Sequence, residues 1–311
     1  MKAKSKPIYS VVVPVFNEAG SIGKLIKEIK SILKSLHSPF EIIVVNDGSS
    51  DTTSLVLSKI RGIKIISFRK NFGQSTALDA GIKKATGSTI VTLDGDGQND
   101  PADIPMLIKK LNQGYDVVCG WRHKRKDSWS KKFVSSVAKR LRVVLVDDKV
   151  HDSGCTLRAY KSECFTEFDL TGEMHRMIPA ILRWRGFRIA EMKVNHRART
   201  AGVSKYGPAR TVKGFLDMLL IWFSRKYNDR PLHFFGTIGL FLIFLSSLLL
   251  GTLALMKIFL GYRLSDKIWP LVGIMGFLAG LQLLVSGILA DLTTKNNTKN
   301  KSWMIREIIE N

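Results

Sequence analysis

Short apolar runs alternate with amphipathic stretches along the first 120 residues of the chain. Five runs rich in β-branched residues have the length of buried strands, at residues 8–13, 40–45, 63–68, 88–93 and 115–120. Four stretches between them repeat apolar side chains at helical spacing, at residues 22–36, 52–60, 75–85 and 101–111. This alternation predicts an α/β fold with a parallel, doubly wound sheet and right-handed crossovers.

Two much longer apolar stretches follow near the end of the chain. Residues 231–256 are 26 positions without Asp, Glu, Lys or Arg, and residues 268–290 are 23 more. At about 1.5 Å per residue, each exceeds the roughly 30 Å hydrocarbon core of a bilayer. Both are apolar on all sides, which favours a transmembrane hairpin over buried helices of a soluble core. We therefore expect a globular domain at 1–207, an amphipathic juxtamembrane region at 208–230, the hairpin at 231–290 and a tail at 291–311.

The distribution of charge predicts the orientation of this hairpin. The apolar run 11–16 is too short for a signal peptide and ends at Asn17 and Glu18. Five Lys/Arg lie between residues 210 and 230 and four follow residue 290, against three in the link 257–267. Cytoplasmic flanks carry the excess of positive charge. We expect an integral membrane protein whose globular domain and two termini are cytoplasmic.

The chain is strongly basic, with 48 Lys/Arg against 26 Asp/Glu and a net charge of +22. Such an excess predicts an anionic partner, which could be nucleic acid, a membrane surface or a phosphorylated substrate. Residues 122–142 hold nine Lys/Arg around an apolar stripe of Trp129, Phe133, Val137 and Leu141. A basic helix with this stripe is typical of a membrane surface and suits lipid better than a phosphodiester backbone. We expect the lipid bilayer as a partner and no nucleic acid.

Acidic residues follow the fourth predicted strand directly, in the sequence Asp94-Gly95-Asp96-Gly97-Gln98. In an open α/β sheet, ligands bind at the carboxyl ends of the strands. Two carboxylates one residue apart and an amide oxygen can hold a hard cation whose open positions substrate phosphates complete. This pattern predicts Mg²⁺ or Mn²⁺ bound by Asp94, Asp96 and Gln98. The alternative is an ordinary polar turn, because Asp-Gly pairs are common in turns.

Other loops at strand ends carry further polar candidates. Asp51 is placed as the N-cap of a helix, whereas Asp47 has no such structural role and could accept hydrogen bonds from uracil or guanine. Asp79 and Asp103 are expected to be solvated helix residues. The chain has neither the Gly-x-Gly-x-x-Gly nor the Gly-Lys-Ser/Thr spacing, which disfavours dinucleotide dehydrogenases and P-loop enzymes.

Several motifs in fixed order resemble the family-2 glycosyltransferases of the GT-A fold. They are Pro14-Val-Phe-Asn-Glu18, Val44-Val-Asn-Asp-Gly-Ser49, Asn71-x-Gly73 and Asp94-Gly-Asp-Gly-Gln98. Two later motifs are similar to those of the dolichyl-phosphate mannosyltransferase and polyprenyl-phosphate glycosyltransferase branch: His151-Asp-Ser-Gly-Cys-x-x-Arg158, and His196-Arg-Ala-Arg199-x-x-Gly-x-Ser-Lys205-Tyr-Gly207. Two departures, Asn46 in place of a second Asp and the sequence Gly97-Gln-Asn-Asp-Pro101, affect loop shape more than chemistry.

The resemblance implies a Rossmann-like, mostly parallel GT-A sheet followed by amphipathic interface helices and a two-helix membrane hairpin. It implies inverting transfer of a sugar from a UDP- or GDP-sugar to undecaprenyl or dolichyl phosphate at the cytoplasmic face. The implied nucleotide-sugar-binding residues are Pro14, Phe16, Glu18, Asp47, Asn71, Gln74 and Asp94. The implied acceptor phosphate-binding residues are Arg122, Arg199 and Lys205, and the implied catalytic residues are Asp152, Asp96 and Arg122.

Some alternatives stay open at this point. Asp152 would be the base, or it would orient the acceptor, because a phosphate monoester with a second pKa of about 6 is already mostly a dianion. The acceptor could instead be another lipid or a glycan, and a non-catalytic membrane scaffold is the alternative outside enzymes. Two spans are few for moving a product across the bilayer, so we expect a separate flippase. Pairing of the spans with further copies of the chain, as in a homo-oligomer, also stays open.

Overall fold

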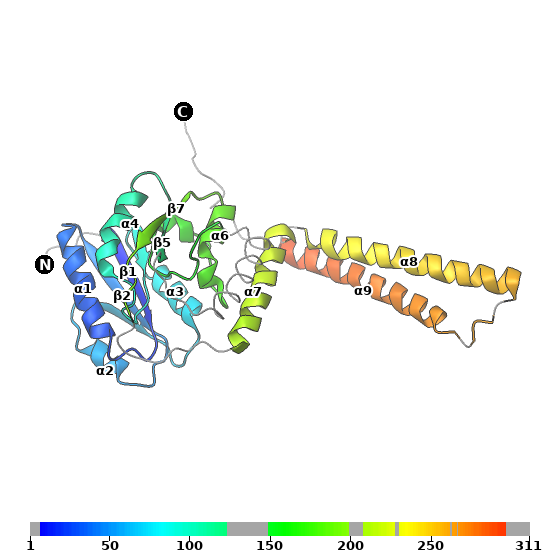
Figure 1. The fold of residues 1–311 in the computed structure, drawn as a ribbon, viewed down its shortest axis with the longest axis horizontal. Helices are drawn as coiled ribbons and strands as arrows, with labels where there is room; N and C mark the ends of the chain where they lie inside the picture. The colour runs from blue at the N-terminus through cyan, green and yellow to red at the C-terminus, as the bar shows by residue number, and fades with distance from the viewer. Residues whose placement is uncertain are drawn as a thin grey trace, which may run out of the picture. The chain divides into compact units, whose positions relative to one another are not determined.

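The structure is a computed structural model that describes residues 7–122, 149–198, 208–227, 230–261, 263–265 and 267–296. The chain divides into two compact units, the first ending at residue 219 and the second beginning at residue 220. The first unit contains the sheet and its covering helices, and the second contains a pair of long helices (Figure 1).

The sheet of the first unit has seven strands in the order β3-β2-β1-β4-β6-β5-β7. In chain order the strands are β1 Tyr9–Val15, β2 Phe40–Asn46, β3 Lys64–Ser67, β4 Thr89–Thr92, β5 Val117–Arg122, β6 Arg158–Lys161 and β7 Ile189–Val194. Only β6 runs antiparallel to its neighbours β4 and β5. The carboxyl ends of β1, β2, β4 and β5 therefore meet at one edge of the sheet, where β6 begins with Arg158 opposite Thr92.

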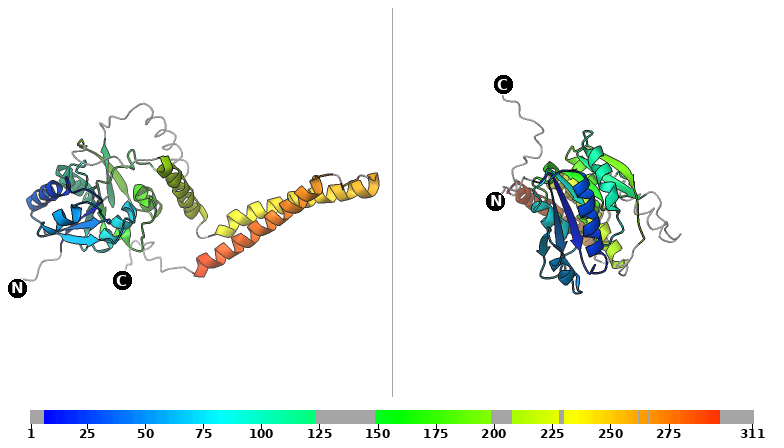
Figure 2. Two further views of the ribbon diagram at one scale, coloured as in Figure 1. Left: turned by 90° about the horizontal axis from the view of Figure 1, so that it is seen from below. Right: turned by 90° about the vertical axis from the view of Figure 1, so that its left-hand side faces the viewer.

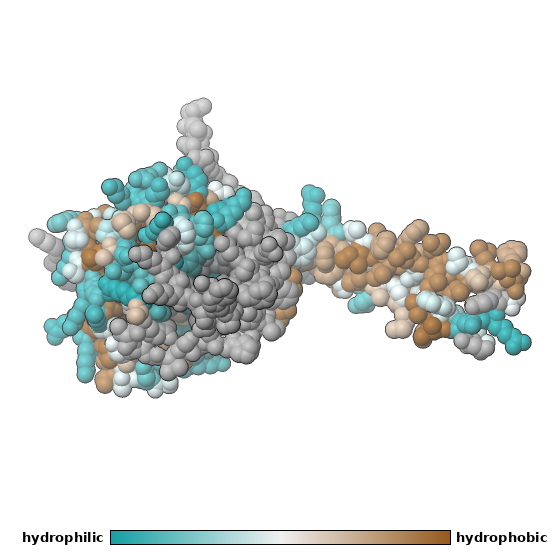
Figure 3. Space-filling view, in the orientation of Figure 1, coloured by the Kyte–Doolittle hydropathy of each residue, from teal (hydrophilic) through white to brown (hydrophobic). Residues whose placement is uncertain are grey.

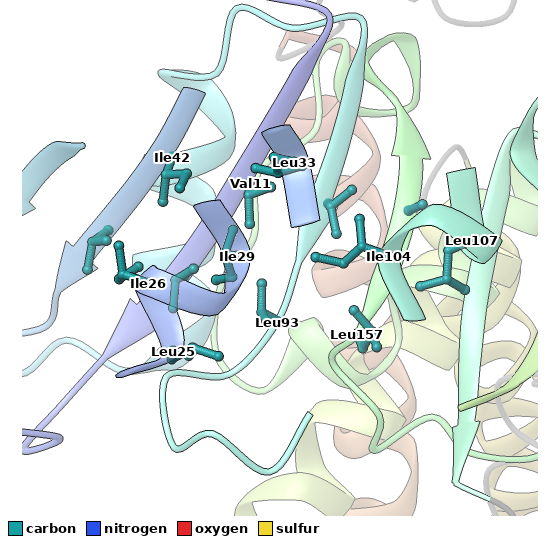
Figure 4. Packing of buried hydrophobic residues seen from close by; sticks show 14 of the residues in the cluster. Val11, Leu25, Ile26, Ile29, Leu33, Ile42, Leu93, Ile104, Leu107 and Leu157 are labelled. Atoms are coloured by element: carbon teal, nitrogen blue, oxygen red, sulfur yellow. The ribbon is translucent and has the colours of Figure 1, made fainter. Parts of the chain in front are cut away.

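Helices cover both faces of this sheet. On one face lie α1 Ile22–Ser35, α2 Thr53–Ser58 and α4 Ile104–Leu111, and on the other lie α3 Gln74–Lys83 and α6 Ile178–Trp184. The side chains of Ile22, Leu25, Ile26, Ile29 and Leu33 form one stripe of α1, and all of them are buried. Figure 4 shows this stripe packed with Val11 and Ile42 of the strands and with Ile104 and Leu107 of α4.

The predicted mostly parallel α/β fold is confirmed, and the five predicted strands and four predicted helices are all present. The stretch 101–111 differs because it begins as the 3₁₀ turn η1 Pro101–Asp103 before α4. Pro105 has no N–H to bond to the carbonyl of Pro101, so Ile104 N makes the shorter 3₁₀-type bond to that carbonyl instead. Strands β6 and β7 and helix α6 are not among the elements expected from the sequence.

The second unit contains α8 Pro231–Leu260 and α9 Trp269–Asn296, preceded by α7 Pro208–Tyr227, which crosses the boundary between the units. Helices α8 and α9 lie side by side along their length (Figure 2). Both are long and apolar enough to cross a membrane, and only 17% of the most apolar window of each is buried. Their outward side chains give the surface of the helix pair its largely hydrophobic colour in Figure 3.

Candidate active site

The loops after β1 and β2 are held together at the carboxyl edge by side chains that bond to backbone. Asn17 has a φ of 57°, in the left-handed region that asparagine tolerates. Its side-chain oxygen accepts hydrogen bonds from Ser50 N at 2.8 Å and Asp51 N at 3.4 Å, and its own N–H donates to Ser49 Oγ at 2.9 Å. These bonds fix the loop that carries Phe16 and Glu18 against the loop that carries Asp47.

Glu18 is joined to the acidic loop through Ser21. The hydroxyl of Ser21 lies 2.8 Å from Glu18 Oε2 and 2.9 Å from the carbonyl oxygen of Gly95. Gly95 has no room for a side chain, because a Cβ there would lie 2.4 Å from Cγ1 of Val15 and 3.1 Å from the carbonyl oxygen of Pro14. The structure therefore brings Pro14, Glu18 and the loop of Asp94 and Asp96 into one part of the carboxyl edge.

Asp47 is buried at the end of β2, where its carboxylate orders the loop after β3. One oxygen accepts from Phe72 N at 2.7 Å, and the other accepts from Gly73 N at 2.9 Å and from Asn71 Nδ2 at 3.0 Å. Burial raises the pKa of Asp47, against the opposing effect of the Phe72 and Gly73 N–H groups. A carboxylate offers about four acceptor positions. Three hydrogen bonds from residues 71–73 thus leave one acceptor position of the carboxylate unused by this loop.

The carboxylates of Asp94 and Asp96 form a pair at the end of β4. The pKa of Asp94 is raised to about 6, because burial and the charge of Asp96 raise it more than the hydrogen bond to Thr156 and the charges of Arg122 and Arg158 lower it. Gln74, the first residue of α3, donates its side-chain amide to Asp94 Oδ1 at 2.6 Å. Asp96 is 8% exposed and accepts from Gln98 N at 3.1 Å. Two carboxylates whose charges repel at one buried position fit a divalent cation.

Two acidic side chains are enough for one kind of metal site. Within the described residues there is no cluster of three or more His, Cys, Asp or Glu side chains with metal-binding geometry. Mg²⁺ sites commonly use one or two carboxylates and complete the shell with waters and substrate phosphates. The donor set at Asp94 and Asp96 therefore fits a cation that binds together with a diphosphate, and it does not fit a structural metal held by protein alone.

Metal affinity is expected to depend on pH through Asp94. A protonated carboxyl must lose its proton to ligate, so metal affinity should fall about tenfold per pH unit below the pKa of about 6. In the metal-free protein the raised pKa of Asp94 means that its protonated carboxyl is favoured in the folded state. Protonated Asp94 therefore contributes to the free energy of unfolding at low pH, and this contribution is lost as the pH rises through about 6. Calorimetric titration of the protein with Mn²⁺ at a series of pH values measures this dependence. An affinity that stays constant down to about pH 5 would contradict the assignment.

The rest of the acidic loop is tied to the segment after β7. The carbonyl of Gln98 accepts from Arg197 N at 2.8 Å, and the amide of Gln98 lies 3.5 Å from His196 Nε2. The guanidinium of Arg197 bonds to Glu28 of α1 at 2.6 Å and to Asp100 at 2.7 Å. Arg197 was not selected from the sequence, although it stands inside the motif that begins at His196. Its structural role is to hold the acidic loop against α1.

Arg122 and Asp152 are brought together as a nearly buried ion pair. The two bonds run from Arg122 Nε to Asp152 Oδ2 at 2.6 Å and from Nη2 to Oδ1 at 2.8 Å, with side chains 13% and 14% exposed. Burial lowers the pKa of Arg122, but the hydrogen bonds and charge of Asp152 outweigh this and raise it. The carboxylate that the resemblance implies as a catalytic residue thus holds the Arg122 guanidinium through two hydrogen bonds. Arg122 ends β5, and its charge also acts on Asp94.

Arg158 is a buried cation to which no role was assigned from the sequence. It is 1% exposed, and its guanidinium donates to the carbonyls of Ser153 at 2.5 Å and His175 at 2.9 Å. The first bond fixes the loop that presents Asp152, and the second fixes the turn at residues 174–176. Its position could be inferred only from the fold, because β6 brings it beside β4 at the carboxyl edge.

The structure corrects the expectations for three aspartates. Asp103 is 3% exposed and accepts from Asn195 N at 2.7 Å, so it is not solvated. Asp79 pairs with Lys83 at 2.7 Å and accepts from Leu170 N at 2.9 Å, so it too is engaged. The N-cap position of α2 is Thr52, yet Asp51 still accepts from Thr53 N at 2.9 Å. Leu170 and Asn195, which donate to Asp79 and Asp103, lie 91 and 92 residues further along the chain, so the local sequence gives no signal for these bonds.

Several predicted residues lie outside what the structure describes. Arg199 and Lys205 belong to this group, as does the basic stretch 123–148 with its apolar stripe. Among the described candidates, the structure gathers the acidic loop, Gln74, Glu18, Asp47, Asn71 and the Arg122–Asp152 pair on loops at one edge of the sheet. Sequence spacing alone did not reveal that Asn71 binds Asp47 or that Arg122 binds Asp152.

Comparison with known proteins finds relatives that match most of this chain. Dodecaprenyl-phosphate galacturonate synthase of Rhizobium johnstonii is 38% identical, over 97% of this chain and 93% of its own. Undecaprenyl-phosphate 4-deoxy-4-formamido-L-arabinose transferase of Aeromonas hydrophila is 32% identical, over 91% of this chain and 87% of its own. Both relatives are named for sugar derivatives of polyprenyl phosphates.

Solved structures with the same fold include glucosyl-3-phosphoglycerate synthase of Mycobacterium tuberculosis in complex with Mn²⁺ and UDP-glucose. That structure has a TM-score of 0.55 and 21% identity, covering 71% of this chain and 80% of its own. The likeness confirms the GT-A-like fold and, at this identity, nothing more specific. The model of the family described as "Glycosyl transferase family 2" matches residues 10–168. With more than half of its length matched and a relative at 38% identity over nearly all of it, this chain belongs to glycosyl transferase family 2.

Proposed function

We propose that this protein transfers a sugar from a nucleoside diphosphate sugar to a polyprenyl phosphate, forming a polyprenyl-phosphate sugar. The observation that carries the proposal is the placement of the Asp94/Asp96 pair and the Arg122–Asp152 ion pair at one edge of the sheet. The polyprenyl-phosphate relatives, which match this chain almost from end to end, support the acceptor class.

The donor side of the proposed site uses the loops after β1, β2 and β3. Asp47 has one acceptor position left for the base, next to Asn71, while Pro14, Phe16 and Glu18 lie on the adjoining loop. Asp94, Asp96 and Gln98 would hold Mg²⁺ or Mn²⁺, and Gln74 orients Asp94. When bound, such a cation neutralises negative charge on the leaving nucleoside diphosphate.

The acceptor side of the proposed site consists of cationic side chains. Arg122, together with Arg199 and Lys205, binds the phosphate of the polyprenyl chain and directs one oxygen to the anomeric carbon. A bond forms between that oxygen and the anomeric carbon while the bond to the diphosphate oxygen breaks, and the electron pair leaves with the nucleoside diphosphate. Attack from the face opposite the leaving group inverts the anomeric carbon. Asp152 fixes the direction of Arg122 through its two hydrogen bonds and removes no proton.

The membrane side of the proposal assigns α8 and α9 to the bilayer. Both have the length and composition of membrane spans. In this assignment the sheet domain and both termini face the cytoplasm, where nucleotide sugars are found, and the prenyl tail stays in the membrane. The hairpin is too small to carry a sugar head across the bilayer, so a separate flippase completes its export.

Membranes that contain the protein test this function directly. They are incubated with labelled UDP- and GDP-sugars, a divalent cation and polyprenyl phosphate, and lipids are then extracted. Label in an acid-labile polyprenyl-linked product is the expected result. Label in another glycolipid or in polymer would favour a different acceptor, and no metal-dependent transfer with any sugar would favour a non-catalytic scaffold.

Asp152→Asn separates an orienting role from a base role. Loss of a charged hydrogen bond to Arg122 is worth about 1.5–3 kcal/mol, so kcat should fall by about 10- to 100-fold. The acid limb of the pH dependence of kcat should stay in place, because the acceptor phosphate and Asp94, both with a pKa of about 6, set it and neither is changed in the variant. Disappearance of that limb in the variant would identify Asp152 as the base. Glu163→Gln, at a side chain 62% exposed on the opposite edge of the sheet, is the matched control.

A further inference from the structure

Helix α9 uses one of its faces to pack against α8. Gly280 and Gly239 let the two backbones approach, since a Cβ on either would lie 2.6 Å from the carbonyl oxygen of the other. Gly273, Gly276 and Gly287 lie on the same face of α9, and each has atoms of α8 against it. Small residues allow this close contact between helices in a membrane. The contact with α8 therefore uses the glycine face and leaves the opposite face of α9 uncovered.

The uncovered face carries a regular stripe of large side chains. Its members are spaced alternately four and three residues apart. This is the spacing of the positions that contact the partner helix in a parallel coiled coil. They are Leu271, Met275, Leu278, Gln282, Val285, Leu289 and Leu292. All are exposed, and the apolar members are between 43% and 63% exposed. We call this set the α9 seam.

Gln282 is the polar member of the seam, and it lies at the middle of the span. The apolar segment runs from Trp269 to Thr294, which places Gln282 13 residues from one end and 12 from the other. Within the described part of the chain, the amide of Gln282 makes no hydrogen bond. Thr252 and Thr293 on these helices instead bond to carbonyls of their own helix, at 2.8 Å each. A side-chain amide left unpaired in hydrocarbon costs several kcal/mol.

We propose that the α9 seam is the contact between copies of this chain, and that Gln282 amides hydrogen-bonded to each other set its register. The inference rests on the proposed assignment of α9 to the bilayer. All copies enter the membrane in the same orientation, so two α9 helices related by a rotation axis along the membrane normal are parallel. Position 282 of one copy then faces position 282 of the next. A prenyl tail is a poor alternative occupant because it has no group that can bond to an amide.

A single polar residue at such a position is known to specify register and the number of helices at some cost in stability. Hydrogen bonds between membrane helices contribute about 1–2 kcal/mol. Replacing Gln282 with leucine is therefore expected to weaken association about tenfold. Asparagine keeps the amide and should retain most of it.

Cysteine cross-linking in native membranes tests the proposal. The three cysteines of the chain, Cys119, Cys155 and Cys164, are buried in the sheet domain, so background cross-linking should be low. Leu278→Cys on the seam should give a band of twice the chain mass on mild oxidation. Ile288→Cys, at a side chain 43% exposed but about 120° around the helix from Gln282, should not. Gln282→Leu combined with Leu278→Cys should reduce the band, and Gln282→Asn should restore it.

Two outcomes would overturn the proposal: equal cross-linking at positions 278 and 288, or a band from Leu278→Cys that Gln282→Leu leaves unchanged. Sugar transfer measured in the same membranes keeps this test apart from the proposed function. Transfer that persists while cross-linking at 278 is absent rejects the seam alone. Cross-linking at 278 without transfer to polyprenyl phosphate rejects the proposed activity and leaves the seam in place.

Discussion

Asp96→Asn is expected to lower kcat of sugar transfer by about a thousandfold, the largest effect of any single substitution. Asp96 is 8% exposed and lies beside Asp94, where its charge contributes to the raised pKa of its neighbour. The asparagine removes one of two carboxylates that would hold the cation. Charge stabilisation by a bound cation is worth several kcal/mol, and about 4 kcal/mol corresponds to a thousandfold in rate.

The measurement compares initial rates of lipid labelling at saturating donor with the amount of protein inserted in the membrane. Insertion should not change, because the substitution lies in the sheet domain and α8 and α9 are intact. Asp169→Asn is the matched control, since that carboxylate is 64% exposed and pairs with Lys83 at the surface. Full activity of the Asp96 variant would reject the metal assignment.

Arg122→Gln is expected to destabilise the sheet domain by about 3–5 kcal/mol, because it leaves the nearly buried carboxylate of Asp152 without its cation. For a domain of this size the melting temperature should fall by about 6–20 °C. The double variant Arg122→Gln/Asp152→Asn carries no orphan charge and should recover most of the loss. Thermal unfolding of the four proteins in the same detergent measures the coupling.

The same four proteins separate stability from function. If Arg122 binds the acceptor phosphate, the double variant should fold well and still transfer sugar poorly, with a raised KM for polyprenyl phosphate. A double variant as unstable as the sum of its single variants would show that the pair in the structure carries no coupling. A double variant with normal transfer would remove Arg122 from the acceptor site.

The central part of the fold was predictable because each central strand is a continuous apolar run. A strand buried on both faces needs no alternation of apolar and polar residues. The continuous apolar runs Val11–Val13 and Ile42–Val45 can therefore be recognised as strands from the sequence. β7 was missed because it lies at the sheet edge, with half-buried side chains and the charged residues Glu191 and Lys193 among its six. β6 was missed because its four residues include Arg158, a cation that only the surrounding fold makes tolerable when buried.

The candidate site likewise has a part that could be predicted from the sequence and a part that could not. The acidic loop could be located because it directly follows a strand, and strand ends collect at one edge. The partners of Asp47, Arg122 and Asp103 could not, because each is between 24 and 92 residues away along the chain. Hydrogen bonds between residues so far apart in sequence depend on how the crossover connections place the loops in space. Neither the spacing of residues nor the composition predicts this placement.

The most direct test of the account uses the purified protein with the donor sugar identified in membranes. Polyprenyl phosphate, the matching polyprenol and diacylglycerol are offered as acceptors, and the product is analysed by mass spectrometry and NMR. We expect that only polyprenyl phosphate is used, and that the product gains one sugar, keeps one phosphate and has the anomeric configuration inverted. Transfer to the alcohol, a product with two phosphates or retention at the anomeric carbon would contradict it.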